Sequence, residues 1–245
     1  MKQTQTDWEE AYQRRETPWE KGQPHPALVD FVAVNGPLEG EIFVPGCGSG
    51  HDVRALVTPE NHVVGMDLAS CAIKKAKARP AIAQEEYLLG DLFDLPAALN
   101  ESFDWVFEHT CFCAIDPLRR RDYVDLIVRL LKPGGKLLAI FFINPDHDQE
   151  GPPYRVSAAE LEEYFGRFFV VEKEWVPTRT HPGREQRELF RLLRVAQASS
   201  SPSDERGGEL AELADQASWK LALPFQKPCV GLCDAFPQRN ARLPA

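Results

Sequence analysis

Apolar runs and amphipathic segments alternate along about the first 195 residues of the chain. Short apolar runs are typical of strands, and segments with a 3.6-residue apolar period are typical of helices. The runs that we predict as strands are 41–45, 62–66, 84–89, 103–107, 136–142, 168–175 and 186–195. The segments that we predict as helices after the first strand are 51–56, 68–77, 116–131 and 157–165. This order, which ends in an antiparallel pair, predicts an α/β fold with a seven-stranded, mostly parallel sheet, one antiparallel strand and helices on both faces.

Another predicted helix, over residues 7–16, precedes the sheet and carries aromatic side chains. Asp7 is suited to cap its first turn. Trp8 and Tyr12 fall on one face of this helix, and Trp19 follows shortly after it. Two interpretations are open: the helix packs on the core through these aromatics, or it forms a lid over a ligand.

A glycine-rich turn follows the first predicted strand. Residues 46–50 read Gly-Cys-Gly-Ser-Gly, so Gly46 and Gly48 alternate with larger residues before a helix begins. Glycine reaches positive φ and lets a ligand approach the backbone closely. Asp67 ends the next strand, where nucleoside-binding α/β folds keep the acid that holds a ribose diol. Together these features predict a nucleoside-type cofactor, because a turn that binds nothing would explain the glycines but not the acid.

An acid also follows the third predicted strand, in the sequence Gly90-Asp91-Leu92. In this architecture an acid here can reach the exocyclic amine of a purine. The alternative is that Asp91 only caps the turn that follows.

A polar cluster follows the fourth predicted strand and contains Glu108, His109 and Thr110. Ligands of doubly wound sheets bind in the crevice at this switch point. Cys111 and Cys113 come next, and we interpret them as small core residues rather than as a catalytic nucleophile.

Composition restricts the classes of partner. The 245 residues carry a net charge of −9 and a pI of about 5.2, which argues against a nucleic-acid-binding protein. No apolar run is long enough to span a membrane, and no signal peptide is recognisable at the start, so we expect a cytoplasmic protein with reduced thiols. Cys229 and Cys233 lack a second pair or a nearby histidine, so we expect no metal site. The composition shifts after Ala196, which predicts one domain over residues 1–196 and an extension of unassigned role over 197–245.

Several motifs together resemble the thiopurine methyltransferase superfamily, and among its branches the halide/thiol (thiocyanate) methyltransferases. The similarity covers about residues 7–195. The motifs that carry it are Thr-Pro-Trp-Glu-Lys-Gly at 17–22, Val-Pro-Gly-Cys-Gly-Ser-Gly-His-Asp-Val at 44–53, Phe-Cys-Ala-Ile at 112–115, Leu-Lys-Pro-Gly-Gly at 131–135 and Gly-Pro-Pro-Tyr at 151–154. The resemblance implies a class I, Rossmann-like methyltransferase with an N-terminal aromatic lid helix and S-adenosyl-L-methionine as cofactor.

The resemblance also implies roles for individual residues. Those expected to bind the cofactor are Trp8, Tyr12, Trp19, Gly46, Gly48, Asp67, Asp91, Leu92 and His109. His109 stands where the family has a tyrosine, and we expect it to accept the thiol proton or to stabilise the thiolate. Tyr154 is expected to orient the acceptor, within a loop over residues 144–156 that we interpret as a substrate cover.

The favoured hypothesis is methyl transfer by in-line displacement to a small thiol or sulfide, with halide as a further acceptor. Alternative acceptors are larger aromatic thiols and selenium or tellurium species. A nicotinamide-dependent oxidoreductase is disfavoured by the G-x-G-x-G spacing. A non-catalytic regulator that binds S-adenosylmethionine is a further alternative. We expect a monomer whose partner is a small-molecule acceptor, with no nucleic acid and no membrane.

Overall fold

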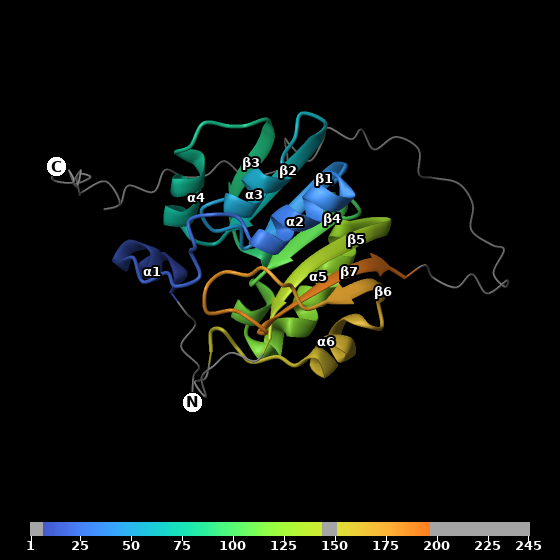
Figure 1. Cartoon of the computed structure of the whole chain (residues 1–245). Coiled ribbons are helices and arrows are strands. Elements are labelled where there is room, and N and C mark those ends of the chain that lie inside the picture. Colours follow the sequence, from blue (N-terminus) through green and yellow to red (C-terminus); the bar gives the residue numbers. More distant parts are fainter. Residues whose placement is uncertain (1–6, 144–150, 197–245) are drawn as a thin grey trace.

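The fold is a seven-stranded mixed sheet, seen in a computed structural model that describes residues 7–143 and 151–196 (Figure 1). The strand order is β3-β2-β1-β4-β5-β7-β6. The strands are β1 (Gly40–Pro45), β2 (Asn61–Asp67), β3 (Gln84–Leu89), β4 (Phe103–His109), β5 (Leu131–Phe142), β6 (Phe169–Trp175) and β7 (Glu188–Val195). Only β7 runs antiparallel to its neighbours, β5 and β6. The predicted sheet, with one antiparallel strand, is therefore confirmed.

Helices cover both faces of the sheet (Figure 1). They are α1 (Trp8–Arg14), α2 (Pro26–Asn35), α3 (His51–Leu56), α4 (Ser70–Lys77), α5 (Arg120–Leu130) and α6 (Ala158–Phe165). Apolar side chains of α2, α3 and α4, among them Leu28 and Val53, form one buried cluster with the sheet. Those of α5 and α6, among them Ile127 and Leu161, form the other. The two clusters are the two halves of the core, one on each face.

Local chemistry explains where helices begin. Asp7 accepts a hydrogen bond from the N–H of Glu10 at 2.8 Å, which caps α1 as predicted. Ser157 and Glu160 form a reciprocal capping box at α6. The helix predicted from residue 116 begins later, because Pro117 opens a 3₁₀ turn before α5 starts at Arg120.

The sheet brings the functional segments to one edge. In the parallel pairing, Pro45 is opposite Met66, and Asp67 is opposite Leu89. The chain segments that leave β1, β2 and β3 therefore emerge at the same level. β1 lies between β2 and β4, so the chain reverses its direction of winding there, and the crevice of a doubly wound sheet opens at this point.

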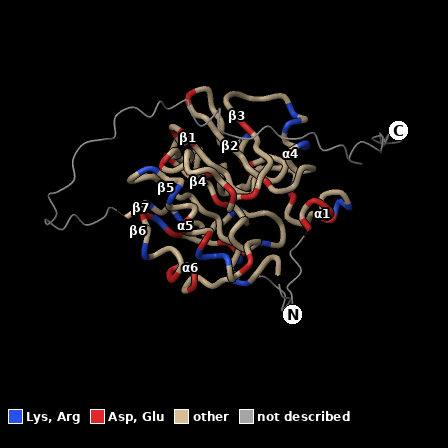
Figure 2. Tube along the Cα trace, turned by 180° about the vertical axis from the view of Figure 1, so that it is seen from behind, with Lys and Arg blue, Asp and Glu red and all other residues tan. Residues whose placement is uncertain are grey.

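Within residues 7–143 and 151–196, no helix has both the length and the apolar character needed to cross a membrane. Positions of both signs of charge are distributed over the described elements (Figure 2).

Candidate active site

A cavity of about 710 Å³ opens at the carboxyl edge of the sheet. Its volume lies in the upper part of the range of roughly 300–1,000 Å³ that is typical of ligand sites. Eight of the ten predicted site residues line it: Trp8, Tyr12, Trp19, Gly46, Asp67, Asp91, Leu92 and Tyr154. Gly48 and His109 do not line it. The structure thus brings most of the predicted residues together, from segments scattered over more than half of the chain.

The turn after β1 requires glycine at positions 46 and 48, for conformational and steric reasons. Gly46 and Gly48 have φ values of 59° and 56°, in the left-handed region. A Cβ at Gly46 would lie 3.0 Å from the sulfur of Cys111, and one at Gly48 would lie 3.1 Å from the hydroxyl of Tyr12. Larger residues would push the cavity walls apart.

Asp67 connects this turn to the next strand. One carboxylate oxygen accepts the N–H of Gly48 at 2.9 Å, and the other accepts the N–H of Ala69 at 2.9 Å. Burial raises the pKa of Asp67, and these hydrogen bonds oppose the rise without cancelling it. Gly48 therefore contributes indirectly, because its N–H positions the acid that lines the cavity.

Aromatic side chains form the N-terminal wall. The ring of Trp19 meets those of Trp8 and Tyr12 edge-on, at centroid distances of 5.2 and 5.9 Å. The Nε1–H of Trp19 donates to the hydroxyl of Tyr12 at 3.2 Å. Glu9 fastens the helix to α4, because its carboxylate accepts from the hydroxyl of Ser70 and the N–H of Cys71, both at 3.0 Å. The helix is thus packed on the fold and also faces the cavity; its action as a lid stays a prediction.

Glu108 shapes the wall that follows β4. It is only 1% exposed, and one oxygen accepts the N–H groups of Cys111 and Phe112 at 2.9 and 3.0 Å. The other oxygen accepts the hydroxyl of Tyr123 in a short hydrogen bond. Burial raises the pKa of Glu108. Glu108 does not line the cavity, and its bonds fix the turn in which Thr110 takes a positive φ of 60° and lines the cavity.

Cys111 and Cys113 line the cavity as thiols. Both are buried, and burial raises the pKa of Cys113 to about 12 and that of Cys111 well above its ordinary value. The thiolate is the nucleophilic form of cysteine, so these values support their interpretation as wall residues.

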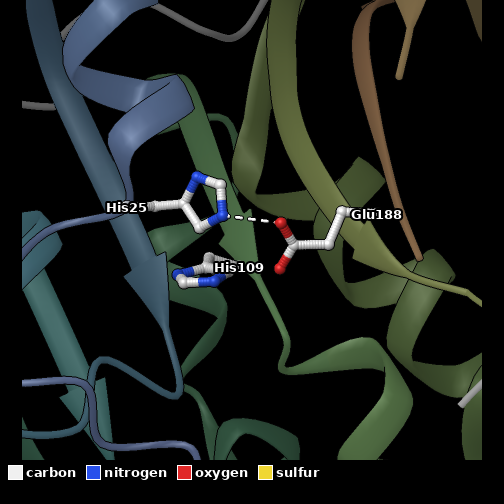
Figure 3. A group of neighbouring side chains, drawn as sticks. All are labelled: His25, His109 and Glu188. Atoms are coloured by element: carbon white, nitrogen blue, oxygen red, sulfur yellow. Dashed lines mark hydrogen bonds and ion pairs between the residues drawn. The ribbon is translucent and has the colours of Figure 1, made fainter. Parts of the chain in front are cut away.

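His109 does not line the cavity and belongs to a polar cluster with His25 and Glu188 (Figure 3). Its Nδ1 lies 2.7 Å from a carboxylate oxygen of Asp52. Its ring meets that of His25 at a centroid distance of 4.7 Å, and the ring of His181 lies 5.0 Å from that of His25 and 6.2 Å from that of His109. Its Nε2 is buried and has no hydrogen-bond partner among the described residues. The catalytic role of His109 stays a prediction.

The composition of this cluster suggests a metal site, but its hydrogen bonds argue against one. His25, His109 and Glu188 each offer a ligand atom within 4.8 Å of the others. However, the Nδ1 of His25 accepts the N–H of Ala27 at 3.1 Å, which leaves the proton on Nε2. That Nε2–H donates to Glu188 at 2.7 Å, as the dashed line in Figure 3 shows. A metal would need the lone pair at this same nitrogen.

His181 provides a test of this buried environment. Burial, followed by the neighbouring His25 and His109, lowers the pKa of His181 to about 4. The unfolded chain binds the proton near the ordinary value of roughly 6.5. The resulting stabilisation is fully present above pH 6.5, and it is lost as the pH falls from 6.5 to about 4.

We therefore expect the urea midpoint of the wild type to fall between pH 7 and pH 4.5 by more than that of a His181→Asn variant. Parallel changes in the two proteins would contradict the buried, neutral state of this ring.

The structure adds residues that the sequence did not indicate. These are Lys21 and Arg184, which line the cavity. Thr110, from the polar cluster predicted after the fourth strand, lines it as well. Arg184 lies in the connection between β6 and β7, where no local pattern marks a ligand site. The part of the predicted substrate cover over residues 144–150 lies outside the described residues, as does the predicted extension over 197–245.

Comparison with known families gives one extensive match. Residues 3–191 match the model of the family described as Thiopurine S-methyltransferase (TPMT). Among curated proteins, the chain is 38% identical over 159 residues to a "Probable thiol methyltransferase 2" of Arabidopsis thaliana, covering 63% of this chain and 69% of that protein. It is 30% identical over 177 residues to a "Thiopurine S-methyltransferase" of Legionella pneumophila (strain Corby), covering 66% of this chain and 80% of that protein.

Solved structures share the fold at lower identity. The N-methyltransferase NodS from Bradyrhizobium japonicum WM9, solved in complex with S-adenosyl-L-homocysteine, has a TM-score of 0.60 and 17% identity, over 77% of this chain and 98% of that one. A SAM-dependent methyltransferase from Methanosarcina mazei has a TM-score of 0.57 and 20% identity, over 68% of this chain and 98% of that one. At these identities the likeness establishes the architecture.

Proposed function

Because this chain belongs to the thiopurine S-methyltransferase family, we propose that it methylates a small thiol or hydrosulfide, which reacts as the sulfur anion. The chain is an S-adenosyl-L-methionine-dependent S-methyltransferase. The observation that carries the proposal is the distribution of charge in the cavity. Asp67 ends β2 and Asp91 follows β3, whereas Arg184 precedes β7, on the other side of the sheet's centre.

The acidic side fits the cofactor. We assign Asp67 to the ribose hydroxyls, Gly46 to the methionine part, and Asp91 with Leu92 to the adenine. The aromatic wall of Trp8, Tyr12 and Trp19 would cover the cofactor, since aromatic faces attract cations such as a sulfonium. When bound, S-adenosylmethionine supplies a methyl group that is already activated for transfer.

The task left to the protein is to position the acceptor and to exclude water. A free thiol has a pKa of roughly 8.5, so a modest preference for the anion suffices near neutral pH. A nearby cation gives this preference. Tyr154 would orient the acceptor, and its own position is fixed by a hydrogen bond from its N–H to the carbonyl of Cys113 at 2.6 Å. Cys111 and Cys113 stay protonated and do not compete for the methyl group.

Two further names among the relatives and the family bear on the acceptor. "Thiocyanate methyltransferase 1" of Brassica oleracea is 36% identical to this chain over 160 residues. The family description itself refers to thiopurines. The name of the Brassica oleracea relative supports a small anionic acceptor. The family description keeps larger aromatic thiols as the alternative.

A direct assay distinguishes these acceptors. Purified protein is incubated with S-adenosylmethionine and, separately, with hydrosulfide, methanethiol, iodide, thiocyanate or a thiopurine, and S-adenosylhomocysteine and volatile products are measured. We expect the highest kcat/KM with hydrosulfide or methanethiol. A clear preference for the thiopurine would replace the proposal by its alternative. Cofactor binding in calorimetry without turnover of any acceptor would favour a regulatory binder.

The cytoplasmic location, the monomeric state, the absence of nucleic-acid or membrane partners, and the division between residues 1–196 and 197–245 stay predictions. Gel filtration with light scattering measures the oligomeric state directly.

A further inference from the structure

We propose that Arg184 is the binding site for the negative charge of the methyl acceptor. This inference rests on the proposed function and assigns it a substrate-binding group. Arg184 comes from the connection between β6 and β7, and it lies on the side of the cavity away from the acids that follow β2 and β3.

Arg184 is buried and yet faces the cavity. It is only 9% exposed, and it lines the cavity wall. Its Nη1 donates to an oxygen of Glu188 at 3.1 Å, and its guanidinium lies 4.8 Å from the ring of Phe142. A guanidinium has five N–H donors, and among the described residues the others of Arg184 have no hydrogen-bond partner. The Arg184 side chain keeps 11% of its surface exposed on the cavity wall, so an anion in the cavity could accept charge-assisted hydrogen bonds from these donors.

The position of Arg184 is fixed from behind. Glu188 is 0% exposed, and while one of its oxygens accepts from Arg184, the other accepts the Nε2–H of His25 at 2.7 Å (Figure 3). His25 is oriented in turn by the N–H of Ala27. This chain of hydrogen bonds connects the start of α2 with the start of β7. It fixes the orientation of the guanidinium and therefore of its free edge, which is formed by the N–H groups that do not bond Glu188.

A second cation adds to the charge on this side. Lys21 lines the same cavity and makes no ion pair with any residue in 7–143 or 151–196. Burial, and then the charge of Arg184, lower the pKa of Lys21, while Glu188 opposes this effect. The carboxylate of Glu188 offsets one positive charge, so Lys21 and Arg184 together leave a surplus of positive charge that a monoanion would balance.

Two anions fit this chemistry: the reacting sulfur itself, as in hydrosulfide or thiocyanate, and the carboxylate of a thiol acid. A guanidinium binds a carboxylate with two parallel hydrogen bonds, and it binds a single anionic sulfur with charge-assisted ones. The shared property is one negative charge placed against the free edge of Arg184.

The test compares Arg184→Gln with a matched control, Arg179→Gln. Arg179 lies in the same connection, is 63% exposed at its side chain, and pairs with Asp30 on the surface. Binding of thiocyanate is measured by calorimetry on protein saturated with S-adenosylhomocysteine, a measurement that needs no turnover. We expect Arg184→Gln to weaken this binding about 10- to 100-fold, in keeping with the loss of a charged hydrogen-bond donor, and Arg179→Gln to leave it unchanged.

Turnover of hydrosulfide, 2-mercaptoethanol and mercaptoacetate then identifies the source of the charge. If the anion is the reacting sulfur, kcat/KM falls for all of these acceptors. If it is a carboxylate, only mercaptoacetate loses its advantage over 2-mercaptoethanol. The dissociation constant of the cofactor is expected to stay within about twofold of the wild type.

The two proposals fail in different ways. Thiocyanate binding that is equal in the wild type and Arg184→Gln, or absent from both, would overturn the role of Arg184. So would an Arg184→Gln variant whose affinity for the cofactor falls as much as its affinity for thiocyanate. Thiocyanate binding that depends on Arg184, in a protein that turns over no thiol, would support the anion site and remove the proposed function.

Discussion

An Asp67→Ala variant is expected to bind S-adenosylmethionine roughly 100-fold more weakly than the wild type. Hydrogen bonds to a charged group contribute about 1.5–3 kcal/mol each, and a ribose diol offers two hydroxyls to this carboxylate. The variant also loses the acceptor for the N–H of Gly48, which lies 2.9 Å from the carboxylate in the wild type. Isothermal titration calorimetry measures the dissociation constant.

Two further variants make this result specific. Asp67→Asn keeps an oxygen for one backbone N–H but removes the charge, so its affinity should fall between those of the wild type and the alanine variant. Asp122→Ala removes a carboxylate that is 62% exposed on α5, and it should bind the cofactor as the wild type does. A folded Asp67→Ala protein with unchanged affinity would mean that the ribose is bound elsewhere.

A Glu108→Ala variant is expected to lose about 3–5 kcal/mol of the free energy of unfolding. Removing one member of a buried charged network leaves its partners buried without acceptors, and changes of this kind fall in that range. Here the N–H groups of Cys111 and Phe112 and the hydroxyl of Tyr123 would lose their shared acceptor. Urea unfolding at pH 7 measures the change.

Glu108→Gln is the matched variant, because its amide keeps the shape and one acceptor oxygen. We expect it to lose only about 1–2 kcal/mol, in line with a weakened hydrogen bond. Since the turn places Thr110 and Cys111 on the cavity wall, cofactor affinity should fall together with stability in the alanine variant. A change of less than about 1 kcal/mol in Glu108→Ala would show that the turn keeps its shape without this acid.

Sequence patterns predicted much of the cofactor side of the site, and the reason is physical. A strand, a glycine turn and a helix are neighbours along the chain, so their local conformational demands appear as local spacing. Asp67 could be placed because parallel strands end at one edge of the sheet, and its pairing opposite Leu89 confirms that geometry. Helical spacing followed by a proline stop predicted the aromatic helix but left open whether it packs on the core or covers a ligand. The family resemblance placed Trp8, Tyr12 and Trp19 at the cofactor.

The residues around the methyl acceptor were harder to predict from the sequence. His109 is the last residue of β4, but its ring turns toward Asp52 and His25 instead of lining the cavity. Strand boundaries place a backbone, whereas the direction of a side chain depends on the hydrogen-bond partners available in the folded protein. Those partners are the residue that caps α2 and a residue of α3, both distant in sequence from β4.

By its sequence alone, then, this protein is determined to be an α/β chain with a nucleoside-type site at the carboxyl edge of a mostly parallel sheet, because periodicity and turn chemistry act between near neighbours. Only the tertiary structure decides that β7 lies between β5 and β6. Only the tertiary structure brings His25 within hydrogen-bond reach of Glu188, 163 residues away, and so directs Arg184 into the cavity. Contacts between such distant residues leave no local pattern, since they form only when both faces of the sheet are packed.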